Sequence, residues 1–241
     1  MKVLILAAGY ATRLYPITRN FPKALLEVGG KTVLDHLFQN LDALEVDTVH
    51  LVTNSLFADR FKAWSTSSKR DRLDIIDDGT ASSETRLGAV GDMKLAVTSR
   101  DIRDDLLVCA ADNIFRFPFS GLRDAFRTHP LAHVCAYQEP SLEKRQEKGN
   151  VVLDEDNRIL EMHEKPRNPK SLWATAPLYV YPASTLPRIE EYLHIGESPD
   201  APGHFLEWLC SVEPVYAYPI QGSVLDIGNP ESLAEARKKL R

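Results

Sequence analysis

The sequence predicts an α/β fold built on a doubly wound, mixed sheet. In the first half of the chain, short apolar runs bounded by turn residues alternate with amphipathic stretches, a pattern typical of strand-helix-strand units on a parallel sheet. In the second half, strand-like runs follow one another more closely, and one pair is joined by a hairpin signal. A chain of 241 residues is long enough to bury one substantial core.

Seven predicted elements make up the parallel first half. The apolar run from Val3 to Leu6 predicts a buried strand, and strands and helices then alternate. The predicted strands cover 3–7, 48–53, 73–77 and 106–111, and the predicted helices cover 33–44, 58–65 and 87–99. Right-handed crossovers place the loops that follow these strands on one edge of the sheet.

The second half predicts further strands and three helices. The strands cover 132–138, 149–163, 173–182 and 214–220, with a hairpin turn at 154–157, and helices lie at 183–193 and 204–211. The chain closes with a helix that Asn229 or Pro230 opens, with acidic residues early and basic residues late, as the helix dipole favours. The sequence contains no linker, no low-complexity segment and no six-residue β-helix repeat.

Composition limits the partners that the chain can have. A formal net charge of -5 gives no general attraction to nucleic acid or to an anionic membrane, and the dispersed basic residues argue against a nucleic-acid-binding module. The opening apolar run is too short for a signal-peptide core or a membrane span. The three cysteines are widely separated and lack metal-type spacing, which indicates a reducing compartment. We therefore expect a cytoplasmic protein.

The loop after the first strand predicts an anion site. Small residues at Ala7, Ala8 and Gly9 allow a phosphate chain to approach the backbone N–H groups, and Arg13 and Lys23 supply positive charge. The loop is neither a P-loop nor a G-x-G-x-x-G fingerprint. Taken alone, it is also compatible with a plain strand-to-helix turn that carries two solvated cations.

The same stretch resembles the signature of the sugar-phosphate nucleotidylyltransferases, in particular the catalytic domain of the glucose-1-phosphate thymidylyltransferase type. AAGYATRLYPITRNFPKAL follows the pattern A-A-G-x-G-T-R-L-x-P-x-T-x-x-x-P-K-x-L, and only the second glycine departs, as Ala11. The resemblance implies a Rossmann-like fold and a Mg²⁺-dependent transfer of a nucleoside monophosphate from a nucleoside triphosphate to a sugar 1-phosphate, which releases pyrophosphate and forms an NDP-sugar. It also implies that the backbone from Leu6 to Gly9 and Arg13 hold the triphosphate, while Lys23 neutralises the reacting phosphates.

Two later carboxylates match the metal ligands of that family. In 107-LVCAADNIF, Asp112 ends a hydrophobic strand, and in 223-SVLDIGNPESLAEA, Asp226 occupies the closing D-I-G element. The resemblance makes Asp112 a ligand of Mg²⁺ beside the nucleotide and makes Asp226 the second ligand, and Mg²⁺ prefers oxygen ligands of this kind. An aspartate at a strand end is also a common turn or cap residue, so that alternative stays open.

The acceptor side of the resemblance lies in the second half. In 161-EMHEKP, it gives Lys165 the sugar phosphate and Glu164 a sugar hydroxyl, and in 147-EKGNVV it places the Gly149 N–H against the sugar. Asn113 and Thr175 complete the implied acceptor set. An exposed ion pair before a proline and a glycine before a strand are the ordinary alternatives. The segment from Asp200 to His204 either closes over the acceptor or caps the helix that follows.

The region that reads the nucleobase is the least decisive. The resemblance places the base near Asp78, Gly79 and Thr80 and against Leu87 and Gly88. The glutamine and proline that the family often carries before that glycine are replaced by Thr85 and Arg86. The sequence therefore leaves the base open.

Taken together, the motifs predict a single nucleotidyltransferase domain with a nucleotide-binding half at about 1–115 and an acceptor-binding half at about 116–241. Two alternatives remain. One is a cytidylyltransferase that acts on a non-sugar phosphate or phosphonate such as phosphocholine, and the other is a regulatory, non-catalytic nucleotide-binding homologue. The acceptor identity, feedback ligands and oligomeric state are undecided, and a homo-oligomer is compatible with the sequence.

Overall fold

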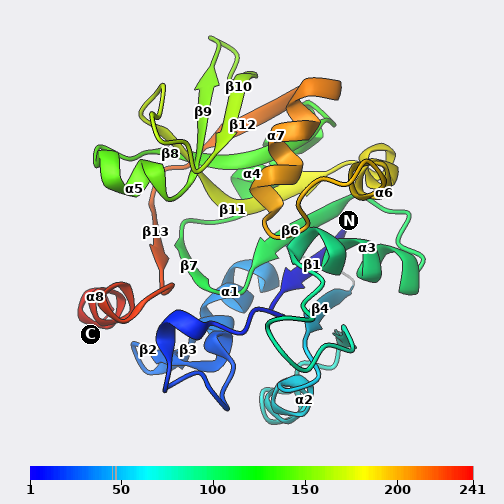
Figure 1. Cartoon of the computed structure of the whole chain (residues 1–241), viewed down its shortest axis with the longest axis vertical. Coiled ribbons are helices and arrows are strands. Elements are labelled where there is room, and N and C mark those ends of the chain that lie inside the picture. The colour runs from blue at the N-terminus through cyan, green and yellow to red at the C-terminus, as the bar shows by residue number, and fades with distance from the viewer. Residues whose placement is uncertain (45, 47, 241) are drawn as a thin grey trace.

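A central sheet with helices on both faces organises the molecule (Figure 1). The computed structural model describes residues 1–44, 46 and 48–240. The central sheet is 9-stranded and comprises β1 (Lys2–Leu6), β4 (Val49–Thr53), β5 (Leu73–Asp77), β6 (Leu106–Ala110), β8 (Ala132–Gln138), β9 (Gly149–Leu153), β10 (Ile159–Glu164), β11 (Trp173–Tyr181) and β12 (Val215–Pro219). The predicted mixed α/β fold is confirmed.

The sheet changes from parallel to antiparallel at its middle. Its main path runs β10-β9-β11-β6-β1-β4-β5, with β8 paired to both β11 and β12. Strands β5, β4, β1 and β6 are parallel neighbours, whereas β11 lies antiparallel to β6. The chain leaves β1 toward β4 on one side and later returns to β6 on the other side, and this reversal of strand order opens a crevice at the carboxyl ends of the strands.

Alternating side chains along the strands build two cores, one on each face. Val3 and Ile5 of β1 pack into the first core, while Leu4 between them packs into the second, as the period of two in a strand requires. The first core is covered by α1 (Val33–Asp42), α2 (Ala58–Ser67) and α4 (Ser120–Thr128), and the second by α3 (Ala89–Ser99), α6 (Leu186–His194) and α7 (Pro202–Val212).

A third apolar cluster joins the two ends of the chain. Leu14 of the opening loop packs with Ile114 of β7, Leu225 of β13 and Leu233 of α8. Figure 1 accordingly shows α8, coloured red, beside the blue β2 and β3. The remaining elements are β2 (Glu27–Val28), β3 (Lys31–Thr32), β7 (Asn113–Arg116), β13 (Ser223–Asp226), α5 (Leu142–Gln146), α8 (Pro230–Lys239) and short 3-10 turns at Thr12–Leu14, Lys23–Leu25 and Ala183–Thr185.

Most predicted elements occur where their sequence patterns placed them. The closing helix α8 begins at Pro230 with Asn229 as its N-cap, and the Asn229 side chain accepts from the Ser232 N–H. Helix α7 begins two residues earlier than predicted, because Pro202 occupies its first turn without loss of a hydrogen bond. The sequence analysis assigned no element to the residues of β2, β3, β7, β13, α4 and α5. Within the described ranges, no helix combines the length and apolar character that crossing a membrane requires.

The start of α3 is held by the loop that precedes α7. The Val90 N–H donates to the Pro199 carbonyl at 2.9 Å, which satisfies a backbone donor that the helix leaves free. This contact requires glycine at position 88. Gly88 has a φ of +79°, and a Cβ there would lie 2.5 Å from the Pro199 oxygen. The first turn of α3 and the loop at Pro199 can therefore pack against each other only because Gly88 has no side chain.

Gly88→Ala is expected to lower the free energy of unfolding by at least about 1 kcal/mol more than Gly79→Ala. Both glycines have positive φ, but a Cβ at Gly79 meets nothing within 4 Å, so the pair separates the steric clash from the backbone strain. Urea denaturation without nucleotide measures both variants. Equal losses would show that the loop at Pro199 adapts freely.

Candidate active site

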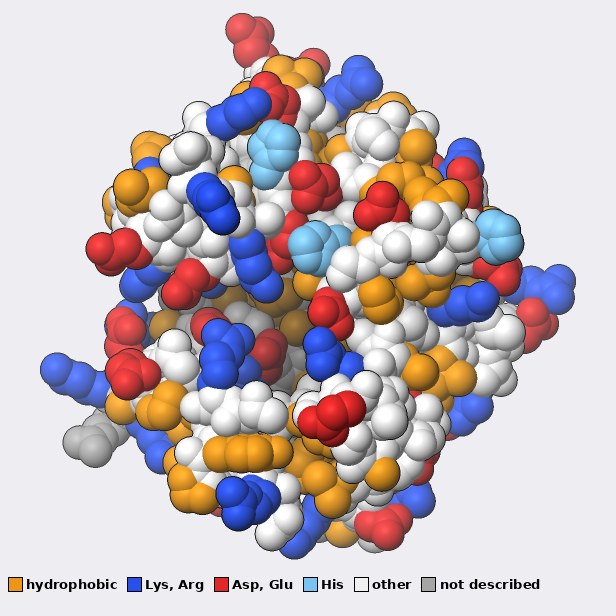
Figure 2. All heavy atoms as spheres, in the orientation of Figure 1, with side chains coloured by type: hydrophobic (Ala, Val, Ile, Leu, Met, Phe, Trp, Pro, Cys, Tyr) orange, Lys and Arg blue, Asp and Glu red, His pale blue; other side chains and the backbone are white. Residues whose placement is uncertain are grey.

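A cavity of about 510 Å³ opens where β1, β5 and β6 end. Its walls come from the opening loop, the loop after β5, the first turn of α3, the end of β6 and the loop before α7. The lining residues are Leu6, Ala7, Ala8, Gly9, Tyr10, Ala11, Thr12, Arg13, Lys23, Ala24, Asp78, Ser83, Arg86, Gly88, Ala89, Asp92, Ala110, Ala111, Asp112, Asp200, Pro202 and Gly228. Figure 2 shows this face of the molecule hollowed near its middle, with basic and acidic side chains around the rim.

The opening loop is fixed to β4 and to the residue that follows it. The Ala7 N–H donates to the Val52 carbonyl at 2.8 Å, and the Ala8 carbonyl accepts from the Asn54 amide at 2.8 Å. Gly9 is exposed, and a Cβ there would meet nothing within 4 Å. The backbone at Gly9 therefore stands open to the cavity on a rigid support, as close contact with a phosphate requires.

Ala11 adopts the backbone conformation that glycine would take. Its φ is 48° and its ψ is 43°, in the left-handed region, and its carbonyl accepts from the Thr18 hydroxyl at 2.8 Å and from the Leu14 N–H at 3.0 Å. The departure from the family signature thus changes the residue and leaves the loop in the left-handed conformation, at a steric cost of about 1 to 2 kcal/mol.

Ala11→Gly should therefore cost less stability than an ordinary alanine-to-glycine change. Glycine relieves the left-handed strain at position 11, and this offsets its greater backbone entropy in the unfolded chain. Ala63→Gly in the exposed middle of α2 has no strain to relieve and should cost about 1 kcal/mol. Thermal or urea unfolding of the two variants measures the difference, and an equal cost would contradict the strain at Ala11.

An ion pair connects the opening loop to the end of β6. The Lys23 Nζ lies 2.8 Å from Asp112 Oδ2, and the Asn113 amide donates to Asp112 Oδ1 at 2.6 Å. Burial opposes ionisation of Asp112, but the charge and hydrogen bond of Lys23 outweigh it and hold the pKa of this carboxyl below its ordinary value. Asp112 is therefore a carboxylate near neutral pH, and Asn113 orients it.

Asp226 lies beside this pair although it is far away in sequence. Strands β7 and β13 are antiparallel neighbours with Asp226 opposite Asn113, and the Ile227 N–H donates to the Asp112 carbonyl at 3.2 Å. Burial and the charge of Asp112 raise the pKa of Asp226, while Lys23 and other cations oppose the shift. Gly228 leaves room for this carboxylate, since a Cβ there would lie 2.7 Å from Asp226 Oδ2.

The two carboxylates make a donor set that fits a hard divalent cation. Their mutual repulsion, expressed in the raised pKa of Asp226, is what a cation between them would relieve. Across residues 1–44, 46 and 48–240, no cluster of three or more histidine, cysteine, aspartate or glutamate side chains has metal-site geometry. A pair of carboxylates suits an ion that takes its other ligands from phosphate oxygens and water.

The predicted acceptor residues form a second cluster at the edge of β9, β10 and β11. Glu164 pairs with Gly149 across the β10-β9 register, and a Cβ on Gly149 would lie 2.4 Å from the Thr175 hydroxyl oxygen. The Glu164 side chain is 8% exposed and lies 3.7 Å from the Lys165 Nζ. Burial raises the pKa of Glu164, while the charges of Lys165 and His204 oppose that shift.

Helix α7 links this acceptor cluster to the 510 Å³ cavity. Pro202 lines the cavity, and Gly203 next to it leaves space for Glu164, whose Oε2 would lie 1.9 Å from a Cβ at that position. Neither Glu164 nor Lys165 lines the cavity itself. The structure therefore brings Gly149, Glu164, Lys165 and Thr175 together as one group, adjacent to the cavity and separate from it, while Asn113 lies beside Asp112.

The residues predicted near the base behave differently from one another. Asp78 lines the cavity, and its Oδ1 accepts from both the N–H and the hydroxyl of Thr80 at 2.7 Å. Thr80 is buried and is also hydrogen-bonded to the Tyr10 hydroxyl at 3.0 Å. Gly79 and Leu87 do not line the cavity, whereas Gly88 does. Thr80 thus supports the wall that Asp78 forms.

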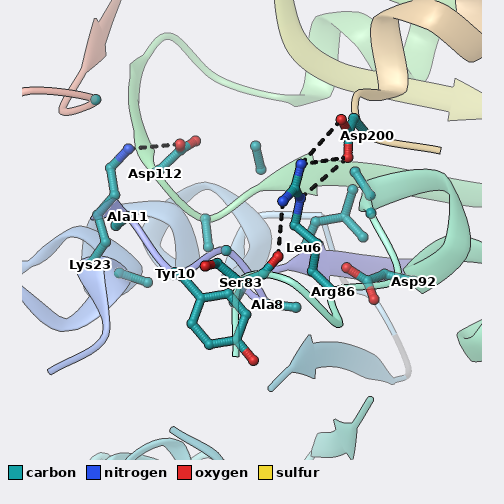
Figure 3. A pocket seen from close by; sticks show the side chains of 18 of the residues that line it. Leu6, Ala8, Tyr10, Ala11, Lys23, Ser83, Arg86, Asp92, Asp112 and Asp200 are labelled. Carbon is teal, nitrogen blue, oxygen red and sulfur yellow. Dashed lines mark hydrogen bonds and ion pairs between the residues drawn. The ribbon is translucent and has the colours of Figure 1, made fainter. Parts of the chain in front are cut away.

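Sequence reasoning did not assign Arg86 or Asp92 to this wall, and it placed Asp200 in a segment that either closes over the acceptor or caps a helix. Arg86 reaches across from the loop before α3 to Asp200, with its Nη2 3.1 Å from Asp200 Oδ1, and it also donates to the Ser83 carbonyl at 2.9 Å (Figure 3). Asp200 therefore lies on the cavity wall with Arg86. Asp92 lines the same region. A signal existed for each acidic or basic residue: Arg86 replaces the usual proline, and Asp92 interrupts an apolar helical stretch.

Asp92 is a buried carboxyl to which the described residues donate no hydrogen bond. Its residue is 5% exposed, and its Oδ1 finds no hydrogen-bond partner among the described residues. Burial, together with the nearby charge of Asp78, raises the pKa of Asp92 to about 7. The folded protein therefore holds a proton on this carboxyl at pH values where the unfolded chain, with an aspartate pKa of about 4, has released it.

This difference makes stability depend on pH in a defined direction. Because the folded state binds the extra proton between about pH 4 and about pH 7, stability falls as the pH rises through that interval. Asp92→Asn removes the titrating group, so its melting temperature should gain on wild type between about pH 5 and about pH 8. Circular dichroism melts at both pH values test this, and a difference that does not change with pH would contradict it.

Comparison with known proteins identifies the family. The family model described as Nucleotidyl transferase matches residues 2–241, and the chain belongs to that family. It is 28% identical over 237 residues to a Sulfolobus acidocaldarius protein named "Putative mannose-1-phosphate guanyltransferase", covering 95% of this chain and 60% of the relative. It is 27% identical over 244 residues to the "Bifunctional protein GlmU" of Methanocaldococcus jannaschii, covering 100% of this chain and 54% of the relative. The resemblance carried by the opening signature is confirmed.

The fold is shared with solved structures over nearly its whole length. A UDP-glucose pyrophosphorylase solved with UDP-glucose superposes with a TM-score of 0.82 at 18% identity, covering 99% of this chain and 97% of the other. At that identity the likeness speaks for the fold alone. The chain spans between 54% and 60% of the length of the two relatives compared above.

Proposed function

We propose that the protein transfers a nucleoside monophosphate from a nucleoside triphosphate to a sugar 1-phosphate, releasing pyrophosphate and forming an NDP-sugar. The observation that carries the proposal is the Lys23-Asp112 ion pair at 2.8 Å, which has Asp226 beside it. This charged centre has the 510 Å³ cavity on one side, and the Glu164 and Lys165 cluster follows across α7. Residues at about 1–115 would bind the donor, and residues at about 116–241 would bind the acceptor.

The donor cavity suits a nucleoside triphosphate. Its volume is within the range of ligand pockets, and the backbone from Leu6 to Gly9 together with Arg13 lines the end that the Lys23 ammonium also reaches. Backbone N–H groups and fixed cations bind phosphate oxygens without a large reorganisation. We assign the triphosphate to this end and the nucleoside to the opposite wall, where Asp78 and Gly88 lie.

The acceptor cluster suits a phosphorylated sugar. Lys165 presents an ammonium group that is about half exposed, next to the shielded carboxylate of Glu164. A phosphate binds an ammonium group, and a carboxylate accepts hydrogen bonds from sugar hydroxyls. Gly149 and Thr175 complete the contact surface that we assign to the sugar, and Asn113 is assigned to hold Asp112 as well as to face the acceptor.

The chemistry needs positioning and positive charge more than it needs a base. An oxygen of the acceptor phosphate forms a bond to the α-phosphorus of the donor, and the bond to the bridging oxygen breaks, so that pyrophosphate leaves with the electron pair. The second pKa of a phosphate monoester is about 6, so the nucleophile is already ionised near neutral pH. Arg13, Lys23 and Lys165 then serve to bring two anions together and to hold the reacting atoms in line.

Asp112 and Asp226 would hold the metal ion, and Mg²⁺ is the assignment that their oxygen donors favour. When bound, the ion supplies charge neutralisation at the reacting phosphates. In the structure described above, Lys23 contacts the same carboxylate. Lys23 would therefore keep Asp112 ionised and oriented before substrate arrives, and its ammonium group would then be available to the triphosphate.

Lys23→Ala is expected to lower turnover by at least about a hundredfold, because loss of one preorganised electrostatic contact in an active site costs about 2.7 to 4 kcal/mol. Pyrophosphate release under saturating substrate measures the loss. Lys31→Ala provides the matched control, since Lys31 is an exposed lysine of β3 that does not line the cavity. If folded Lys23→Ala turned over within about tenfold of wild type, the catalytic role assigned to Lys23 would be contradicted.

The two alternatives from the sequence analysis make different demands. A non-sugar phosphate such as phosphocholine would need an acceptor pocket that favours a cation, whereas Lys165 gives this cluster a positive charge next to Glu164. A regulatory homologue would be expected to have lost a phosphate cation or a metal carboxylate. Arg13, Lys23, Asp112 and Asp226 are all present near one another here, and Lys165 is present in the acceptor cluster. The retained residues favour an enzyme over a regulatory homologue, and the positive charge of Lys165 favours a sugar 1-phosphate over a cationic acceptor.

A further inference from the structure

Two carboxyl groups at the end of the cavity that we assign to the nucleoside each have an oxygen that accepts no hydrogen bond from the described residues. Asp92 Oδ1 and Asp78 Oδ2 are buried, and neither has a hydrogen-bond partner within the described part of the chain. Both residues line the cavity. In Figure 3, Asp92 lies on the side of the cavity opposite to Lys23 and Asp112.

Neither carboxylate is explained by the local fold. An acid in the first turn of a helix often caps free N–H groups, but the N–H of Val90 is taken by the Pro199 carbonyl and that of Asp92 by the Gly88 carbonyl. Thr80 donates both of its hydrogen bonds to Asp78 Oδ1, so Asp78 Oδ2 receives none from it. Arg86, the nearby cation on this wall, pairs with Asp200. Above about pH 7, where Asp92 is ionised, the described residues therefore leave two acceptors without a donor.

Such an arrangement is costly in the free protein. A buried carboxylate that lacks a donor loses its hydration without compensation, and a second carboxylate nearby adds repulsion. The raised pKa of Asp92 reflects both effects. A ligand that supplies N–H groups would recover this cost upon binding, and the gain would depend on how many donors the ligand presents at that point.

We infer that Asp92, with Asp78, reads the nucleobase of the donor and selects a base with an exocyclic amino group: adenine, guanine or cytosine. The inference rests on the proposed function, because it is the triphosphate at Arg13 and Lys23 that puts the base at the opposite end of the cavity. An amino group offers N–H donors to these two carboxyl groups, which line the cavity and for which the described residues supply no side-chain donor beyond Thr80. Uracil and thymine offer a single ring N–H between two carbonyl oxygens, and those oxygens would face the carboxylates.

The first test compares nucleotides in the wild-type protein. With Mg²⁺ and a panel of sugar 1-phosphates, kcat/KM for the best of ATP, GTP and CTP should exceed that for UTP and dTTP by at least about tenfold. Dissociation constants for the same triphosphates, measured by calorimetry without acceptor, should show the same order. A preference for UTP or dTTP would overturn the inference and leave the proposed function intact.

The second test substitutes Asp92, the residue that we assign to base recognition. Asp92→Asn replaces an oxygen acceptor by an amide that both accepts and donates, which matches the N–H and carbonyl edge of uracil. The ratio of kcat/KM between the preferred triphosphate and UTP should fall by at least about tenfold. Asp101→Asn is the matched control, since Asp101 is an exposed aspartate just beyond α3 that does not line the cavity.

The remaining outcomes separate the possible failures. An equal loss for all triphosphates in Asp92→Asn would indicate contact with ribose or a structural role, and would overturn the inference. Binding of no triphosphate to wild type would overturn the inference and the proposed function together. Base-selective binding with no pyrophosphate release would contradict only the proposed function. If Asp92→Asn does not fold, the wild-type ratio still decides the inference.

Discussion

The ion pair between Lys23 and Asp112 is the contact on which the rest of the site depends. Lys23 belongs to the opening loop and Asp112 to the end of β6, so their contact at 2.8 Å joins two neighbouring crossovers of the parallel sheet. The backbone carbonyl of Asp112 accepts a hydrogen bond from the Ile227 N–H, and this contact brings Asp226 next to the ion pair. The third apolar cluster, through Leu14 and Leu225, supplies the packing that holds these segments against one another. The ion pair and the third apolar cluster therefore stabilise the same arrangement of these segments.

The two halves of the sheet present different functional groups. The parallel half presents loops at one edge, where small residues and cations suit a phosphate chain, and the antiparallel half presents Glu164 and Lys165 from a strand edge. Helix α7 lies between them, with Pro202 facing the cavity and Gly203 against Glu164. In the function proposed above, the nucleotide would bind in the cavity and the phosphorylated acceptor at the second cluster, and an in-line displacement requires that the two approach from different sides.

The sequence predicted the parts of the site that depend on local pattern, and it could not predict those that depend on packing. Periodicity located β1, β6 and α8, and the signature located the opening loop, because these features are written in consecutive residues. The left-handed φ of Ala11 is imposed by the surrounding loop, and alanine alone gives no sign of it. The pairing of Arg86 with Asp200 joins two loops far apart in the chain, and the burial of Asp92 depends on α3 meeting the sheet. Local pattern marks Arg86 and Asp92 as unusual residues, but it could not identify their surroundings, because these join segments that are far apart in the sequence.

Pyrophosphate release by the wild-type protein is the measurement that tests the central claim most directly. Each common nucleoside triphosphate would be offered with Mg²⁺ and with sugar 1-phosphates, phosphocholine and aminoethylphosphonate in turn. The account predicts release that requires a sugar 1-phosphate and stops when the metal is chelated. Silence across the whole panel while a triphosphate still binds would contradict the account, and would point to a regulatory nucleotide-binding protein.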